Sequence, residues 1–280
     1  MLGELGEDAK LLAGGQSLIP LMKLRLSSPS HLVDLNFVRG LSGLSRSNGG
    51  LHVGAMARHA ELADSALVSA IPLLHDCASG IADVQVRNRG TIGGSLAEAD
   101  PSGDWGAVLL ALPAEVRSVG AAGERSIPIA DFYLDAYTTV LAPSEIVREI
   151  VVRVPQGASG GAYVAMKRCA PVYATASVAA QLTMDDDRAT CREARIVLGC
   201  VGLTAIRARH AENELTGKEV NDAAVARAAE AAMAAADPQP DMRGSVEYKR
   251  VLVRSLARRA IQIALRRSRG EQVPGGHIYA

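Results

Sequence analysis

Short apolar runs that end at glycine, proline or polar residues are the main pattern in the first part of the chain. Such runs predict buried strands that end in turns. The expected strands are Lys10–Ala13, Leu32–Leu35, Leu51–Ala55 and Glu149–Val154. Apolar residues at helical spacing predict the intervening helices. The expected helices are a short one carrying Leu18, Leu21 and Met22, a segment from Arg58 to Cys77 interrupted at Pro72, and one that starts at Asp100-Pro101 and stops at Pro113.

A different pattern follows Gln156–Gly161, a run of small and polar residues that is the best linker candidate in the chain. Beyond it, strands come first and Ala-rich helices afterwards, which is the order of an α+β domain. The expected strands are Tyr163–Arg168, Tyr173–Met184 and Ala194–Val201, and the expected helices are Arg207–Leu215, Asp222–Ala236 and Val246–Arg267. We therefore predict two domains, residues 1–157 and residues 161–280.

The composition is typical of a globular protein, and we expect it in the cytoplasm. Thirty basic residues offset 30 acidic ones, so no overall charge attracts nucleic acid or a membrane surface. No apolar run reaches the roughly 18 residues of a membrane span, and the first residues lack the pattern of a secretory signal. The four cysteines (Cys77, Cys169, Cys191 and Cys200) form no C-x-x-C pair, so we expect ordinary thiols and no iron–sulfur cluster in this chain.

Two Gly-Gly segments carry the candidate chemistry. They are Ala13-Gly14-Gly15-Gln16-Ser17 and Thr91-Ile92-Gly93-Gly94-Ser95, and each is followed by an apolar helix start. Glycine permits positive φ and a close approach of the backbone to a ligand, and successive N–H groups in such a loop attract phosphate oxygens. Two loops of this kind predict a ligand with two linked phosphates, which is a dinucleotide. Neither segment fits the Rossmann or P-loop pattern.

The residues around both segments resemble a known family. Residues 13–23 (AGGQSLIPLMK) resemble the first FAD-binding loop of the medium subunit of aerobic carbon monoxide dehydrogenases, a molybdenum hydroxylase family, and residues 87–97 (RNRGTIGGSLA) resemble its second loop. Later parts of the same subunit are similar to ADPSGD at 99–104, YVAMKR at 163–168, YATA at 173–176 and YKRVLVR at 248–254. The resemblance covers nearly the whole chain and is most specific in the second loop.

The resemblance implies a fold, a cofactor and partners. The fold is α+β: a vanillyl-alcohol-oxidase-type domain of two α/β subdomains that holds FAD non-covalently, then a small C-terminal domain of antiparallel sheet and helices. The partners are an iron–sulfur small subunit with 2Fe-2S clusters and a large subunit with the molybdenum cofactor, assembled as a dimer of heterotrimers. Electrons would cross the clusters to FAD and leave for an external acceptor. Relatives carry about one more strand and helix before the first loop, whereas nine residues precede Lys10 here, which indicates a truncated or misplaced start.

The resemblance also implies roles for single residues. Ala13, Gly14, Gly15, Gln16, Ser17 and Leu18 would wrap the pyrophosphate, and Thr91, Ile92, Gly93, Gly94 and Ser95 would hold phosphate and ribityl oxygens from the other side. Asp104 would accept a hydrogen bond from a ribityl or ribose hydroxyl, Lys167 would lie near the pyrimidine edge of the flavin, and Tyr173 near the isoalloxazine. From the residues alone, ordinary interpretations stay open: an acidic first turn of a helix for Asp104, a solvated strand lysine for Lys167 and a core tyrosine for Tyr173.

The remaining polar clusters give weaker evidence of a functional site. His75, Asp76 and Cys77 are sequence neighbours, which do not face one another on a helix, so we expect neither a metal site nor a catalytic nucleophile. Basic residues gather at the C-terminal end: Arg254, Arg258, Arg259, Arg266, Arg267 and Arg269. We interpret them mostly as a solvated helix face, with a partner-docking surface as the alternative.

Three functions are open to such a chain. The favoured one is an electron-transfer flavin subunit. A self-sufficient flavin oxidase would need its own substrate pocket and a catalytic acid–base cluster, and the sequence shows no such cluster. A non-catalytic nucleotide-binding or assembly protein would not need Lys167 and Asp104 beside two intact loops. The substrate is not predicted, because it would bind another polypeptide.

Overall fold

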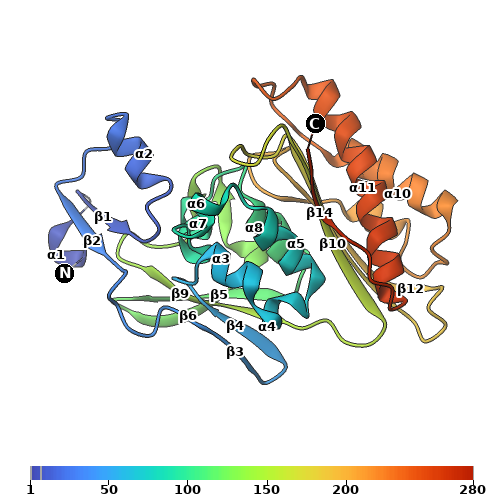
Figure 1. Ribbon diagram of the computed structural model, residues 1–280, viewed down its shortest axis with the longest axis horizontal. Coiled ribbons are helices and arrows are strands. Elements are labelled where there is room, and N and C mark those ends of the chain that lie inside the picture. The colour runs from blue at the N-terminus through green and yellow to red at the C-terminus, as the bar shows by residue number, and fades with distance from the viewer. Residues whose placement is uncertain (1, 7, 280) are drawn as a thin grey trace.

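The computed structural model describes residues 2–6 and 8–279 and has three parts along its long axis (Figure 1). A small N-terminal lobe is followed by a five-stranded sheet with short helices, and then by a second five-stranded sheet with two long helices. The expected α+β class is confirmed. Within this described part of the chain, no helix is long and apolar enough to cross a membrane.

The N-terminal lobe is built around the first glycine segment. After α1 (Leu2–Leu5), strand β1 (Ala9–Leu12) pairs in parallel with β2 (His31–Asp34), and helix α2 (Leu18–Lys23) connects them. These two strands and this helix were expected. Gly15 adopts a φ of +71°, a conformation that costs glycine nothing, and this lets the chain turn sharply from β1 toward α2.

The central sheet has the strand order β3-β4-β9-β5-β6, and every neighbouring pair is antiparallel. Its strands are β3 (Leu44–Ser47), β4 (Gly50–Gly54), β5 (Ala114–Gly120), β6 (Gly123–Pro128) and β9 (Ile146–Arg153). The helices beside it are α3 (His59–Asp64), α4 (Ala66–Ser69), α5 (Pro72–Gly80), α6 (Val84–Arg87), α7 (Ile92–Glu98) and α8 (Asp104–Leu110). A 3-10 turn (Ile129–Asp131) and the short strands β7 (Tyr133–Asp135) and β8 (Thr138–Thr139) precede β9.

Two expected helices have different boundaries. Helix α8 does not start at Asp100-Pro101, because Asp100 instead closes a turn: its carboxylate accepts a hydrogen bond from the Ser102 N–H (2.9 Å), and its carbonyl accepts one from the Gly103 N–H (2.8 Å). The segment from Arg58 to Cys77 is three short helices, since the backbone leaves the helical region at Ser65 and Ile71. The second of these breaks precedes Pro72, where an interruption was expected.

The second glycine segment is a helix and not a loop. Residues Ile92–Glu98 form α7, and Thr91 caps its N-terminus by accepting a hydrogen bond from the Gly94 N–H (3.1 Å). Gly93 is required by packing, because a Cβ there would lie 2.5 Å from the Cβ of Ala55. The Gly-Gly pair therefore lets the first turn of α7 approach the end of β4.

The C-terminal sheet has the strand order β13-β12-β11-β10-β14. Its strands are β10 (Ser159–Lys167), β11 (Ala176–Met184), β12 (Cys191–Gly199), β13 (Ile206–Arg207) and β14 (Gly276–Tyr279), and its helices are α9 (Arg209–Asn213), α10 (Asp222–Ala235) and α11 (Val246–Ser268). The three expected strands correspond to β10, β11 and β12, although β11 starts later than predicted. Strand β14 was not predicted. It pairs in parallel with β10 and places His277 opposite Ala165.

The two large sheets share one layer of helices. Side chains alternate along a strand, so Tyr163 and Ala165 of β10 belong to the same core as α5 and α8, whereas Ala162 and Val164 belong to the core beneath α10 and α11. Figure 1 shows α5 and α8 between the two sheets. Helices α5 and α8 are thus held between both sheets, and this arrangement fixes the cavity described below.

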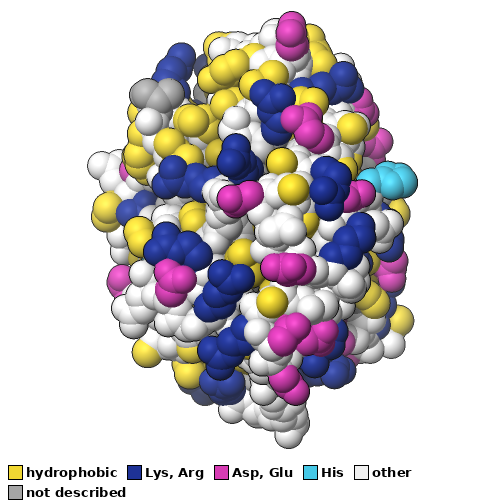
Figure 2. Space-filling model, turned by 90° about the vertical axis from the view of Figure 1, so that its right-hand side faces the viewer, with side chains coloured by type: hydrophobic (Ala, Val, Ile, Leu, Met, Phe, Trp, Pro, Cys, Tyr) yellow, Lys and Arg dark blue, Asp and Glu magenta, His cyan; other side chains and the backbone are white. Residues whose placement is uncertain are grey.

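The arginines of α11 are largely at the surface, as expected. Arg254 pairs with Glu230 and Arg266 with Glu271 at exposed positions. Figure 2 shows basic and acidic side chains intermingled on the face formed by the C-terminal domain. Arg267 is the exception: its side chain is only 10% exposed and pairs with Asp76 of α5. The interpretation as a solvated face is therefore wrong for this residue.

Candidate functional site

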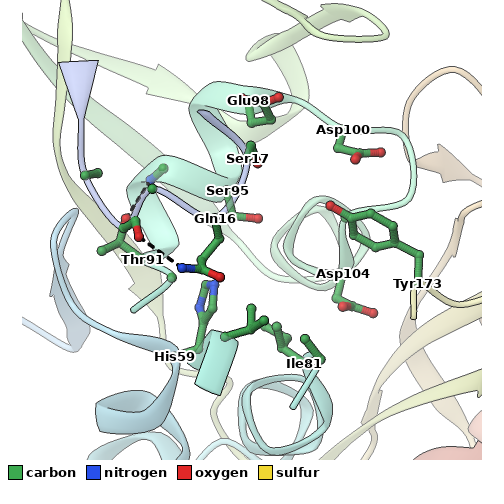
Figure 3. Close-up of a pocket in the computed structure, with 18 of the residues that line it drawn as sticks. Gln16, Ser17, His59, Ile81, Thr91, Ser95, Glu98, Asp100, Asp104 and Tyr173 are labelled. Carbon is green, nitrogen blue, oxygen red and sulfur yellow. Dashed lines mark hydrogen bonds between the residues drawn. The ribbon is translucent and has the colours of Figure 1, made fainter. Parts of the chain in front are cut away.

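A cavity of about 310 Å³ opens where the N-terminal lobe, α7 and the loop that follows β10 meet (Figure 3). Its walls come from segments far apart in the sequence. They are Leu11, Ala13, Gly14, Gly15, Gln16, Ser17, Leu18, His59, Ile81, Ala82, Val86, Gly90, Thr91, Gly94, Ser95, Glu98, Asp100, Gly103, Asp104, Lys167, Pro171, Val172 and Tyr173.

Most of the site residues predicted from the sequence meet in this one cavity. Those that line it are Ala13, Gly14, Gly15, Gln16, Ser17, Leu18, Thr91, Gly94, Ser95, Asp104, Lys167 and Tyr173. Ile92 and Gly93 do not line it. Their N–H groups donate to the carbonyls of Ala57 (3.1 Å) and Ala55 (2.8 Å), so these two residues anchor α7 behind the cavity wall.

The first glycine segment supplies free backbone donors. Among the described residues, none accepts a hydrogen bond from the N–H groups of residues 14–17. Gly14 lets this turn touch the backbone just before the second segment, since a Cβ on Gly14 would lie 2.4 Å from the carbonyl oxygen of Arg89. A row of unpaired N–H groups in a turn favours an anion.

The second segment supplies a hydroxyl rather than free N–H groups. The N–H groups of Gly94 and Ser95 donate to the side chain and the carbonyl of Thr91 respectively, at 3.1 and 3.0 Å. The Thr91 hydroxyl is thus engaged as the helix cap, and the Ser95 hydroxyl is available to a ligand in the cavity. The two glycine segments therefore differ in chemistry, although they look alike in sequence.

Asp104 is a buried carboxylate at the cavity wall, and it is contacted by Tyr163 and His277. The Tyr163 hydroxyl donates to it at 2.5 Å, and Nε2 of His277 lies 3.7 Å away. Burial opposes ionisation of Asp104, but the nearby His277 and Lys167 outweigh it and leave its pKa below the usual value. Asp104 is also the first residue of α8. It is therefore both the acidic residue in the first turn of a helix and a residue of the cavity wall.

Lys167 is almost completely buried, with 1% of its surface exposed. Its ammonium donates to the carbonyl of Gly80 at 2.7 Å, at the C-terminal end of α5. The interpretation as a solvated strand lysine is therefore wrong. A buried ammonium with one carbonyl acceptor keeps donor capacity for an anionic or carbonyl oxygen in the cavity.

Tyr173 is not a core residue, because 47% of its surface is exposed. It lies at the cavity wall beside Asp100, as Figure 3 shows. Burial of its hydroxyl, together with the charge of Asp100, raises the pKa of Tyr173 above its ordinary value. The phenol therefore stays protonated at neutral pH and can donate a hydrogen bond.

Several lining residues were missed by the sequence reasoning. His59 is buried beneath the second segment, and burial lowers its pKa to about 4. Glu98 and Asp100 add carboxylates to the wall, and burial followed by the charge of Asp100 raises the pKa of Glu98. Asp100 lies in the stretch ADPSGD, which resembles the family, so the resemblance could have identified it. His59 is an isolated residue outside every motif.

The cysteines are free thiols, as expected: Cys77 and Cys191 are buried, Cys200 is partly buried and Cys169 is exposed. Burial raises the pKa of Cys191 to about 11 and that of Cys200 to about 12, so neither is a thiolate at neutral pH. Within residues 2–6 and 8–279 no cluster of His, Cys, Asp and Glu could hold a metal ion.

Comparison with known proteins identifies the family. Residues 1–156 match the family model described as the FAD binding domain in molybdopterin dehydrogenase, and residues 161–264 match the CO dehydrogenase flavoprotein C-terminal domain. The chain belongs to this family of flavoprotein subunits. The family that the sequence resembles is thereby confirmed.

Individual relatives match this flavoprotein subunit over nearly its full length. It is 40% identical to the 6-hydroxypseudooxynicotine dehydrogenase complex subunit alpha of Paenarthrobacter nicotinovorans, covering 96% of this chain and 91% of that one. It is also 40% identical to the carbon monoxide dehydrogenase medium chain of Hydrogenophaga pseudoflava, covering 94% and 92%. The solved carbon monoxide dehydrogenase of Hydrogenophaga pseudoflava superimposes with a TM-score of 0.92 at 41% identity, covering 95% and 92%.

The cavity of the flavoprotein subunit has the donor set that FAD requires. The N–H groups of the first glycine segment and the Ser17 and Ser95 hydroxyls suit phosphate and sugar oxygens. The buried Lys167 suits a carbonyl or an anionic ring position. Apolar residues complete the walls at Ile81, Ala82, Val86, Pro171 and Val172. The residues present therefore fit the dinucleotide.

Proposed function

We propose that this chain binds FAD non-covalently in the cavity and passes electrons as one subunit of a molybdenum hydroxylase. The observation that carries the proposal is the coexistence in one cavity of unpaired N–H groups at residues 14–17 and a buried ammonium at Lys167. The first group suits the pyrophosphate. The second suits the pyrimidine edge of the flavin.

The proposed binding roles follow from what each side chain can donate or accept. Ala13 to Leu18 wrap the pyrophosphate through their backbone, and the Ser95 hydroxyl donates to it or to a ribityl oxygen. Asp104 accepts a hydrogen bond from a sugar or ribityl hydroxyl, and the protonated phenol of Tyr173 lies near the ring system. When bound, FAD takes up and releases electrons, and Lys167 stabilises the negative charge that reduction brings to the ring.

The proposed assembly rests on the relatives. Their names, "medium chain" and "complex subunit", describe parts of larger enzymes. We infer that this chain accompanies an iron–sulfur small subunit and a molybdenum-binding large subunit, as a dimer of heterotrimers in the cytoplasm. Electrons would reach its FAD from the 2Fe-2S clusters and leave for an external acceptor. Within the chain, residues 1–157 would bind FAD, and residues 161–280 would form the C-terminal domain that adds Lys167 and Tyr173.

The test is purification from the source cell under native conditions, with a native mass and flavin identification. We expect a yellow complex with two further polypeptides, and acid precipitation should release FAD into the supernatant. Colour that stays with the pellet would contradict non-covalent binding, and released FMN would contradict the assignment to a dinucleotide. A stable monomer or homodimer that hydroxylates a substrate unaided would support the self-sufficient oxidase instead.

A further inference from the structure

His59 lies at the cavity wall and takes no part in the FAD contacts proposed above. It is the first residue of α3, where its N–H donates to the carbonyl of Gly90 at 3.1 Å. Only 5% of its surface is exposed, although its ring is part of the cavity lining, and Figure 3 shows the ring between α3 and the cavity. A buried imidazole usually has hydrogen-bond partners for both ring nitrogens.

One ring nitrogen has a partner that fixes the tautomer. Nε1 of Trp105 donates to Nδ1 of His59 at 3.3 Å within the core. The indole N–H is a donor and never an acceptor. Nδ1 must therefore carry a lone pair, and the proton of the neutral ring sits on Nε2. Burial holds the pKa of His59 at about 4, so the ring stays neutral near pH 7.

The other ring nitrogen is left with a proton and no acceptor. No described residue accepts a hydrogen bond from Nε2 of His59. Gly90 keeps this edge of the ring open, because a Cβ on Gly90 would lie 2.9 Å from Nε2 and 2.8 Å from Cδ2. Any other residue at position 90 would crowd the Nε2–H group. The fold thus fixes a neutral N–H donor at the cavity wall and leaves it without a partner among the residues that the structure describes.

We infer that His59 donates its Nε2–H group to an acceptor oxygen of the bound dinucleotide, as a neutral counterpart to the cationic Lys167. This inference rests on the proposed FAD binding and adds a binding residue to it. A neutral donor adds hydrogen-bond energy without adding charge. His59 would therefore add to the FAD affinity without placing a positive charge in the cavity, whereas the cationic Lys167 favours the reduced state.

The test uses the native complex that contains the full chain, stripped of flavin and titrated with FAD. His59→Phe removes the donor and keeps an aromatic ring, and His59→Gln restores an N–H donor near the position of Nε2. Losing one neutral hydrogen bond corresponds to a roughly 2- to 12-fold weaker dissociation constant. We expect this loss for H59F, recovery to within about twofold for H59Q, and no change for the control H210F in α9.

Each outcome bears on a separate statement. Equal FAD affinity of H59F and the wild type would overturn the role of His59 while leaving FAD binding intact. An equal loss in H59F and H59Q would also overturn it, because the ring and not the donor would then matter. Thermal unfolding of the flavin-free complexes is measured in parallel, since H59F leaves the Trp105 N–H unpaired. A wild-type complex that takes up no FAD would overturn the proposed function and this inference with it.

Discussion

Arg267 and Asp76 are 191 positions apart in the sequence, yet they form a bidentate ion pair that joins α11 to α5. The guanidinium donates to both carboxylate oxygens, at 2.6 and 3.0 Å. Arg267 also donates to the carbonyls of Gly161 and Val273, and Asp76 accepts the N–H of Tyr163. The pair thereby ties α5, β10 and α11 together and holds the C-terminal tail that leads to β14.

Arg267→Met should destabilise the chain strongly. The side chains of Arg267 and Asp76 are only 10% and 6% exposed, and removal of one partner leaves a buried charge without compensation. We expect a loss of about 3–5 kcal/mol in the free energy of unfolding, measured with urea. The control is Arg254→Met, whose pair with Glu230 is exposed, and which should cost less than about 1 kcal/mol. Similar losses in both variants would mean that the buried pair has no special weight.

Gly94→Val should abolish FAD retention and leave most of the fold in place. Gly94 lines the cavity, so branched methyl groups there would occupy space that the ligand needs. A Cβ would also lie 2.8 Å from Oγ1 of Thr91 and disturb the cap of α7. Thr91→Ala is the matched control, because it removes the cap without adding bulk, at about 0.5–2 kcal/mol of stability. Retained flavin is read from the absorbance of the purified complexes.

Ser17→Ala should be milder than Gly94→Val. It removes one neutral donor and leaves the N–H groups of residues 14–17 unchanged, so we expect a loss of about 0.5–1.5 kcal/mol in FAD binding. Titration of the flavin-free complex with FAD gives this value. A Ser17→Ala variant that loses FAD as completely as Gly94→Val would show that side chains, and not the backbone, carry the site.

Lys167→Met should lower the midpoint potential of the flavin. A buried ammonium beside the ring stabilises the anionic reduced form, and a hydrogen bond to a charged group contributes about 1.5–3 kcal/mol. For a two-electron couple this corresponds to a decrease of roughly 30–65 mV. Lys249→Met is the matched control: Lys249 is 3% exposed but pairs with Asp241, outside the cavity. Spectroelectrochemical titration should show an unchanged potential for this variant, and an equal shift in both would remove the role of Lys167.

Much of the fold could be predicted from local patterns. The strands β1, β2, β4, β9, β10, β11 and β12 and the helices α2, α9, α10 and α11 follow from apolar runs and helical spacing. Strand β14 could not be predicted, because its only strongly apolar residue is Ile278, and it pairs with β10, which lies far away in the sequence. The later start of α8 could not be predicted either, because Asp100 is as good a turn former as it is a helix cap.

The site was predictable to the extent that it rests on short motifs. The residues of the first glycine segment and Lys167 meet in the cavity as the resemblance implied. The two glycine segments look alike in sequence, but Gly15 serves a turn, whereas Gly93 serves the packing of α7 on Ala55. His59 was missed because its role depends on Trp105, 46 positions away, and a contact of that range leaves no trace in a single sequence.

Glu145 should make the unfolding stability depend on pH at the acid end. Its carboxylate accepts two hydrogen bonds from Arg125, at 2.6 and 2.7 Å, and one from the Ser118 hydroxyl at 2.5 Å. The bonds from Arg125 foremost lower the pKa of Glu145 to about 2, against roughly 4.3 in the unfolded chain. A lowered folded pKa contributes stability that is present above about pH 4.3 and is lost as the pH falls toward 2.

Glu145→Gln should therefore cost about 1.5–3 kcal/mol at pH 7, the usual contribution of hydrogen bonds to a charged group, and progressively less as the pH falls below about 4.3. Urea unfolding of wild type and variant at pH 7, about 4 and about 3 isolates this residue, because the other carboxylates titrate alike in both chains and cancel in the difference. Glu124→Gln is the control, since the Glu124 side chain is 57% exposed and pairs with the half-exposed Arg148. Its effect should stay small at every pH. A difference between wild type and Glu145→Gln that does not shrink with falling pH would show that Glu145 contributes through packing and not through its charge.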